Sequence, residues 1–318
     1  MACEGAPRII VDELRARRQR GCDGRRPLGE ESGNMRLGAH VSASGGLDKA
    51  IDRAHEMGAE TIQVFVSSPR QWRFHSPKEE HVLAFREKSE ATGVAPTFFH
   101  GSYLVNVGGT PDLVRKSVDL LVENMNVAAQ VGAAGVIFHG GSHKGVGFEA
   151  VLDQAASALS EVLESSPNDA WLIVENCAGM GSQIGASFGE IGRLIQAVGS
   201  PRMKVCLDTE HCFAAGYNIA DPKALDDAMD EFDREIGLER LVAVHANDAK
   251  VELGSGVDRH ENIGDGHIGI AGFEVLMSHP AFRDVPFVLE VPGPDKKGPD
   301  KENLDRLKAI RTRLGIAI

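Results

Sequence analysis

Eight short apolar runs recur along this chain, at intervals that leave room for a helix between each pair. The runs comprise residues 37–41, 62–66, 97–99, 136–138, 171–174, 205–207, 241–244 and 287–289. They are apolar throughout, which is typical of strands buried on both faces of a parallel sheet. Intervening stretches such as 48–58, 112–132 and 148–164 space their apolar residues helically. Eight strand and helix units predict an α/β fold, a single (β/α)8 TIM barrel.

The alternative fold is a doubly wound open sheet. Such a sheet usually carries a G-x-G-x-x-G fingerprint after an early strand, and none follows the first apolar run. The chain has 318 residues and is 42% hydrophobic, which is enough to bury one large core. No apolar run reaches roughly 18 residues, so no membrane span is expected. The start of the chain lacks the pattern of a signal peptide.

Residues 1–34 differ in composition from the rest of the chain. They are rich in arginine and in acidic residues, and they lack a strand-like pattern. We expect a flexible N-terminal extension over residues 1–34 and one barrel domain over 35–318. The five cysteines are odd in number and form no C-x-x-C pair, which favours a reduced, cytoplasmic location.

The stretch KVCLDTEHCFAAG, residues 204–216, shows how the apolar runs end. A short apolar run is followed at once by Asp208 and, three residues later, by His211. Carboxylate and imidazole together suit zinc or manganese. The alternative is structural: Asp208 caps the next helix and His211 lies in its first turn. Taken alone, this stretch favours the structural interpretation.

Most of the other apolar runs are also followed directly by a histidine or an acidic residue. The carboxyl ends of barrel strands meet on one face, so these side chains are expected to converge there. That many buried polar groups without partners would be costly, and bound cations would compensate them. The donors exceed what one tetrahedral zinc needs, so two or three ions are expected. The expected donors are His100, His139, Glu175, Asp208, His211, His245 and Glu290, with Asp258 and His260 in the loop after the seventh run.

At these residues the chain resembles the endonuclease IV family, the metal-dependent endonucleases that act on abasic DNA. The resemblance runs from about Met35 to the C-terminus. Its motifs are GAHVSASGGL, RQW, HGSYLVNVG, FHGGSH, VENCAGMG, LDTEHCFAAGY, HANDAK, VDRH and LE.

The resemblance implies three metal ions per chain, mostly zinc. His100 and His139 would bind the first. Glu175 would bridge it to a second ion, whose other ligands are Asp208, His245 and Glu290. The third would be held by His211, Asp258 and His260.

Two departures from the family pattern concern the metals. The usual D-T-C-H reads D-T-E-H here, so Glu210 adds a carboxylate, and the usual GEGNIG reads GDGHIG at 264–269. Neither removes an expected ligand. An additional carboxylate favours manganese, which is therefore an alternative to zinc in one position.

The implied activity is hydrolysis of the phosphodiester bond 5′ to an abasic site, leaving a 3′-hydroxyl and a 5′-deoxyribose phosphate. Activity on 3′-blocked ends is expected too. A metal-bound hydroxide would be the nucleophile, with Glu175 and Glu290 as the catalytic carboxylates.

The implied partner is double-stranded DNA containing abasic sites, and a monomer without membrane association is expected. By resemblance, Arg70, Tyr103 and Leu104 would contact the damaged DNA and fill the gap in the base stack. The net charge of −12 has the wrong sign for a typical DNA-binding protein. The positive charge of three divalent ions would exceed the negative charge of the four ligating carboxylates, so the site itself would be positive.

Two other functions compete with this one. A metal-dependent sugar isomerase or epimerase has the same type of barrel, but needs a smaller ligand set and no third metal position. A non-catalytic DNA-binding module would not explain nine converging donors.

Overall fold

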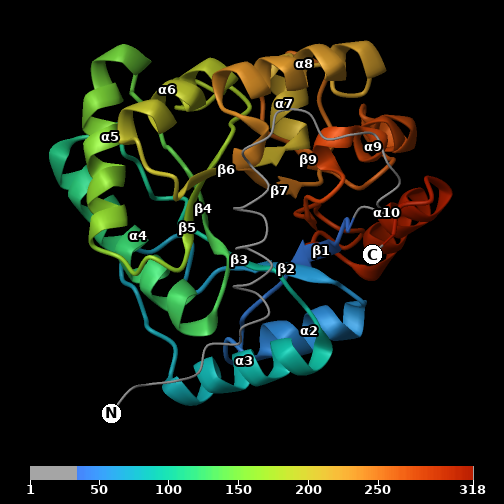
Figure 1. Ribbon diagram of the computed structural model, residues 1–318, viewed down its shortest axis with the longest axis horizontal. Coiled ribbons are helices and arrows are strands. Elements are labelled where there is room, and N and C mark those ends of the chain that lie inside the picture. The colour runs from blue at the N-terminus through green and yellow to red at the C-terminus, as the bar shows by residue number, and fades with distance from the viewer. Residues whose placement is uncertain (1–33, 318) are drawn as a thin grey trace, which may run out of the picture. The chain divides into compact units, whose positions relative to one another are not determined.

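Eight parallel strands close into a barrel in the order β1-β10-β7-β6-β5-β4-β3-β2 (Figure 1). The structure, a computed structural model, describes residues 34–317. All eight predicted runs form strands of this barrel, so the predicted fold is confirmed. The strands are β1 (Leu37–His40), β2 (Thr61–Val64), β3 (Thr97–His100), β4 (Gly135–His139), β5 (Trp171–Glu175), β6 (Met203–Asp208), β7 (Leu241–His245) and β10 (Phe287–Leu289).

The helices lie around the outside of the barrel (Figure 1). Their ends follow from local sequence: α4 begins with Pro111 at its first position, and Gly132, with φ 75°, ends it. The helices are α2 (Lys49–Met57), α3 (Glu79–Thr92), α4 (Pro111–Val131), α5 (Phe148–Glu164), α6 (Phe188–Val198), α7 (Thr209–Ala215), α8 (Pro222–Glu235), α9 (Gly269–Ser278) and α10 (Lys301–Arg313), with 3₁₀ turns η1 (Leu238–Arg240) and η2 (Pro280–Phe282).

The buried core has two parts. The larger lies between the strands and the surrounding helices. The smaller is a separate cluster, and its members come from six different barrel strands: Phe98, Ile137, Ile173, Cys206, Ala243 and Val288. These residues fill the interior of the barrel, as expected for inward-pointing side chains.

Strand alternation then places the polar residues. Side chains two residues apart in a strand point to the same face. Phe98 belongs to the interior cluster, so His100 also points inward, one layer nearer the carboxyl end of β3. The same parity applies to Ile173 and Glu175 in β5. The polar layer therefore rests directly on the apolar filling of the barrel.

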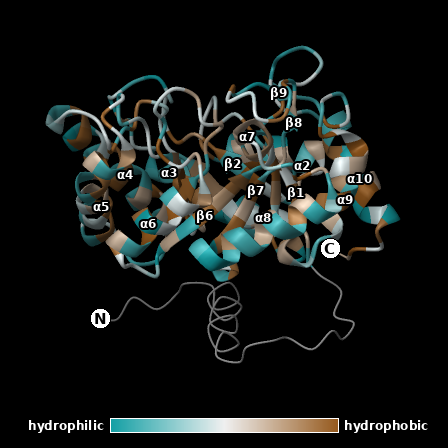
Figure 2. Ribbon diagram, turned by 90° about the horizontal axis from the view of Figure 1, so that it is seen from above, coloured by the Kyte–Doolittle hydropathy of each residue, from teal (hydrophilic) through white to brown (hydrophobic). Residues whose placement is uncertain are grey.

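A short antiparallel ribbon lies beyond β7, made of β8 (Asp248–Ala249) and β9 (His260–Glu261). The sequence did not predict it. Figure 2 shows it among the loops at the end of the barrel that also carries α7. The buried carboxylate of Asp248 accepts hydrogen bonds from several backbone N–H groups between Gly264 and Gly269. These bonds hold the loop after β9 against the ribbon.

The predicted extension over residues 1–34 lies outside the described residues, except for Asn34. The boundary at Met35 stays a prediction. Between residues 34 and 317, no helix has both the length and the apolar character needed to cross a membrane.

Candidate metal centre

The first donor group consists of His100, His139 and Glu175, from the ends of β3, β4 and β5. The Nε2 atoms of His100 and His139 lie 3.2 Å and 3.5 Å from Glu175 Oε2. Glu175 is fully buried. Both imidazoles thus face one oxygen of a carboxylate that has no access to solvent.

The second donor group shares Glu175 with the first and adds Asp208, His245 and Glu290. Nδ1 of His245 lies 3.0 Å from Glu175 Oε1 and 3.2 Å from Glu290 Oε2. The two oxygens of Glu175 therefore face different donor groups. This is the arrangement that a carboxylate bridging two cations requires.

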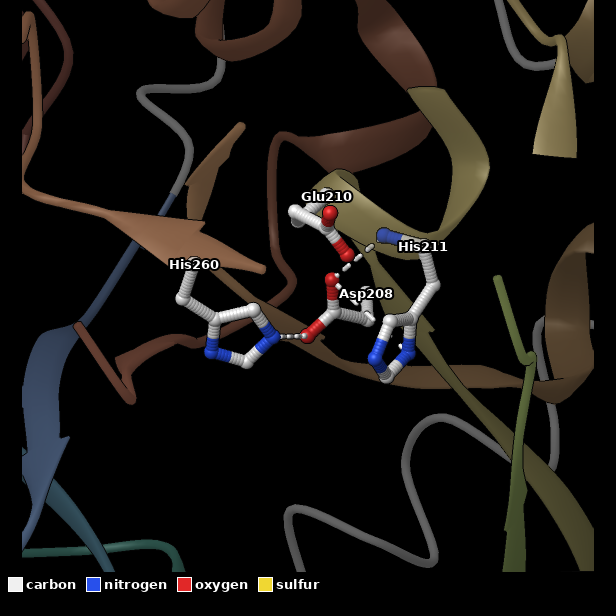
Figure 3. Close-up of side chains that lie close together, drawn as sticks. All are labelled: Asp208, Glu210, His211 and His260. Atoms are coloured by element: carbon white, nitrogen blue, oxygen red, sulfur yellow. Dashed lines mark hydrogen bonds and ion pairs between the residues drawn. The ribbon is translucent and has the colours of Figure 1, made fainter. Parts of the chain in front are cut away.

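The third donor group comprises Asp208, Glu210, His211 and His260. Figure 3 shows the carboxylate of Asp208 between the two imidazoles, with Glu210 beside it. Asp258 is not a member of this group, but its carboxylate lies 3.4 Å from His211 Nε2 and 3.6 Å from His260 Nε2. The structure thus brings together all nine predicted donors and adds Glu210, and their role as ligands remains a proposal.

Asp208 caps α7, as the structural interpretation of its stretch expected, and its carboxylate also faces two imidazoles of the donor groups. Its Oδ1 accepts a hydrogen bond from the backbone N–H of His211 and so caps α7. Its Oδ2 lies 3.8 Å from His245 Nδ1 and 3.7 Å from His260 Nε2. The capping bond orients the carboxylate between the second and third donor groups.

The electrostatics of the cluster follow from its burial and its imidazoles. Burial opposes ionisation of Glu175, but the nearby His139 and His245 hold its pKa well below the usual value. Burial likewise opposes ionisation of Glu290, and His245 lowers its pKa. Glu210 behaves differently: burial, and then the neighbouring Asp208, raise its pKa to about 7. Cations would stabilise all three as carboxylates.

The three residues predicted to contact DNA lie at the same end of the barrel. Tyr103 and Leu104 follow β3, and Arg70 is exposed in the loop after β2. The two loops are joined, because Ser102 Oγ and the backbone N–H of Tyr103 both donate to the carbonyl oxygen of Pro69. The Tyr103 ring centroid is 5.9 Å from that of His100, yet Tyr103 is 55% exposed. An aromatic ring therefore stands beside the donor cluster and faces solvent.

Comparison with known proteins identifies the family. A family model described as a xylose isomerase-like TIM barrel matches residues 51–311. A probable endonuclease 4 of Chloroflexus aurantiacus is 36% identical over 278 residues, which cover 86% of this chain and 98% of the relative. One from Halobacterium salinarum is 39% identical, covering 87% and 100%. The crystal structure of endonuclease IV from Thermus thermophilus is 35% identical, with a TM-score of 0.77 over 89% of this chain and 100% of that one. The chain belongs to the endonuclease IV family. The resemblance inferred from the motifs is thereby confirmed.

The barrel also resembles more distant proteins. A D-tagatose 3-epimerase-like protein has a TM-score of 0.65 at 17% identity. This likeness shows a shared fold and carries no argument about activity.

The residues present in this member of the endonuclease IV family fit bound cations. Among residues 34–317, two buried side-chain atoms lack a hydrogen-bond partner, Glu210 Oε2 and His260 Nε2. Both belong to the third donor group. Orphaned buried polar atoms are rare in native proteins, so their occurrence in this donor group favours a bound divalent ion there.

The sequence interpretation missed the residues that orient the donors. Gln63, fully buried in β2, accepts a hydrogen bond from His245 Nε2 at 2.8 Å and donates to Glu290 Oε1 at 2.5 Å. Asn176 bonds the backbone of Asp208, and Asn247 donates to Asp208 Oδ2 at 2.7 Å. A signal was present for each: Gln63 interrupts an apolar strand, Asn176 directly follows Glu175, and Asn247 lies two residues after His245.

Proposed function

We propose that this chain is an AP endonuclease that hydrolyses the phosphodiester bond 5′ to abasic sites in double-stranded DNA. The products would be a 3′-hydroxyl and a 5′-deoxyribose phosphate. The observation that carries the proposal is the linkage of the donor groups: Glu175 belongs to the first and second, and Asp208 to the second and third. Family membership and the relatives' printed names support it.

The cofactor set belongs to this proposal. We assign three divalent cations, one to each donor group, with zinc as the main ion. Such ions stabilise attacking and leaving oxygens and lower the pKa of water. Asp258 contacts both imidazoles of the third group and would complete it.

The carboxylates have separate tasks. Glu175 presents one oxygen to each of two donor groups and holds those groups at a short spacing. Glu290 is oriented by Gln63, so its carboxylate is placed to accept a proton from an attacking water. The same chemistry would remove blocking groups from 3′ ends, because those are also phosphate esters.

Recognition is assigned to the joined loops after β2 and β3. Tyr103 and Leu104 would fill the gap left by the missing base, while Arg70 contacts the backbone. The abasic sugar would then turn towards the donor cluster next to the Tyr103 ring.

The test uses the full chain with a labelled duplex containing one abasic analogue, an intact duplex and a panel of ketoses. We expect incision of the abasic duplex alone, loss of incision after chelation, and a 3′ end that a polymerase extends. About three zinc equivalents per chain should accompany full activity. Turnover of a ketose without incision would overturn the proposal in favour of the isomerase.

Two variants separate catalysis from recognition. Glu175→Gln should lose at least one ion and slow single-turnover cleavage by several orders of magnitude while retaining affinity for abasic DNA. The double variant Tyr103→Ala with Leu104→Ala should keep its metal and lose discrimination between abasic and intact duplex. Glu87→Gln, on the exposed surface of α3, is the control. Near-normal cleavage by Glu175→Gln with full metal content would contradict the bridging role. Unchanged discrimination by the double variant would contradict the recognition role.

A further inference from the structure

Glu210 is a buried carboxylate of the third donor group to which the proposed function gives no role of its own. It lies in the first turn of α7 and is fully buried. Its Oε1 accepts a hydrogen bond from the backbone N–H of Arg259 at 3.0 Å. Its Oε2 has no hydrogen-bond partner. Such an oxygen is costly to bury unless something binds it.

A second unsatisfied atom lies in the same donor group. His260 Nε2 has no hydrogen-bond partner, and the nearest carboxylate oxygens, from Asp258 and Asp208, are 3.6 Å and 3.7 Å away. One potential ligand atom each from Asp208, Glu210, His211 and His260 lies within 4.8 Å of the others. Figure 3 shows these four side chains gathered around the Asp208 carboxylate. A single cation can therefore contact one atom from each of these four side chains, two of which carry the unsatisfied atoms.

The chemistry of this group differs from that of the first. The first donor group has two imidazoles and one carboxylate, a set that suits zinc. Including Asp258, the third region offers three carboxylates and two imidazoles, which is more than tetrahedral zinc uses. Carboxylate-rich sites with higher coordination numbers favour manganese.

We propose that Glu210 is an additional ligand of the cation held by His211 and His260, and that it shifts this position from zinc towards manganese. The inference rests on the proposed function in one respect, since that function requires a cation there. The alternative is that Glu210 is a neutral acid with a purely structural role. The ligand role and the structural role predict different effects of Glu210→Gln on metal binding.

Two variants and one control decide between them. Glu210→Gln keeps the size of the side chain and removes its charge. Glu210→Asp keeps the charge and withdraws the oxygens by one methylene. Glu261→Gln is the matched control: it makes the same chemical change next to His260, at a carboxylate that pairs with Lys250 and belongs to none of the donor groups.

The experiment strips each protein with a chelator and reloads it from a mixture in which manganese is in large excess over zinc, because a given site usually binds zinc more tightly. Metal content is measured by mass spectrometry, and bound manganese by electron paramagnetic resonance. Wild type and Glu261→Gln should retain about one manganese per chain. Glu210→Gln should bind manganese at least about tenfold more weakly and contain zinc or nothing there. Glu210→Asp should show intermediate manganese binding with an altered resonance spectrum.

Two results would overturn the proposal. One is equal manganese occupancy and an identical resonance spectrum in wild type and Glu210→Gln. The other is a wild-type protein that takes up only zinc from the mixture. If Glu210→Gln does not fold, Glu210→Asp decides, because an unchanged spectrum in that variant excludes direct ligation.

Failure of the nuclease proposal would look different. In that case wild type would not incise abasic duplex, although its manganese content still depended on residue 210. If the protein is an active nuclease and its metal content does not change when Glu210 is replaced, only the proposal about Glu210 is contradicted.

Discussion

Three donor histidines each have one ring nitrogen engaged by a neighbour outside the donor groups. Nδ1 of His100 donates to the carbonyl oxygen of Gly101, and Nδ1 of His211 donates to that of Asn176. In His245 the order is reversed, because Nε2 donates to the Gln63 amide oxygen. The other ring nitrogen, which faces a carboxylate of the cluster, is therefore Nε2 in His100 and His211 and Nδ1 in His245. Such contacts set the tautomer and orientation of metal-binding imidazoles.

Gln63 provides a test of this effect. Gln63→Leu should fold, but it removes the acceptor for His245 and the donor for Glu290. We expect about 10- to 100-fold weaker binding of the zinc ion in the second donor group, measured by competition with a chromogenic chelator. Gln130→Leu, on the exposed surface of α4, should bind zinc as wild type does. Equal zinc affinity in the Gln63 variant would show that His245 is oriented by other contacts.

At the scale of elements, α10 ties the two ends of the described barrel together. The guanidinium of Arg311 donates to the carbonyl oxygen of Met35 and to both carboxylate oxygens of Glu60, at 2.6–2.8 Å. Glu60 in turn accepts the backbone N–H of Leu37 in β1. The Arg311 side chain is only 7% exposed. This buried pair connects the last helix to the first two strands.

Removing one partner of such a pair should be costly. Arg311→Leu leaves a carboxylate without its cation, and we expect the free energy of unfolding to fall by about 3–5 kcal/mol in urea denaturation. Arg313→Leu, on the same helix but exposed and paired with Glu274, should cost at most about 1 kcal/mol. Adding Glu60→Gln to Arg311→Leu should restore part of the loss. A similar cost for both arginine variants would mean that the pair has no special role.

At the scale of the whole molecule, the barrel and the proposed site lie within residues 35–318. The closing strand pair joins β1 to β10, and every predicted site residue falls between Arg70 and Glu290. The domain boundary at Met35 remains a prediction, because residues 1–33 lie outside the described part of the chain.

A chain that starts at Met35 tests that boundary. We expect it to melt at the same temperature as the full chain and to incise abasic duplex at the same rate, because it retains every strand that the structure describes and every predicted donor. Calorimetry and single-turnover kinetics on both chains provide the comparison. A clear loss in either would show that residues 1–34 contribute to the fold or to the site.

The sequence by itself determined the eight strands and most of the donors. Apolar runs indicate burial on both faces, and a polar residue that closes such a run is expected on the face where the carboxyl ends of barrel strands meet, as with His100. Both signals are local, so they can be read without knowing which strands are neighbours.

Tertiary structure decided how the donors are grouped. The distance of His260 from Asp208 depends on the β8–β9 ribbon, whose strands of two residues each carry too little pattern to predict. The reach of Gln63 to both His245 and Glu290 depends on barrel closure, in which β1 pairs with both β2 and β10 and so brings β2 near β10 and β7. Glu210 Oε2 is buried without a hydrogen-bond partner, and this depends on which segments pack around it in the folded chain. Distances between segments remote in sequence follow from closure and register of the sheet, and no local pattern encodes them.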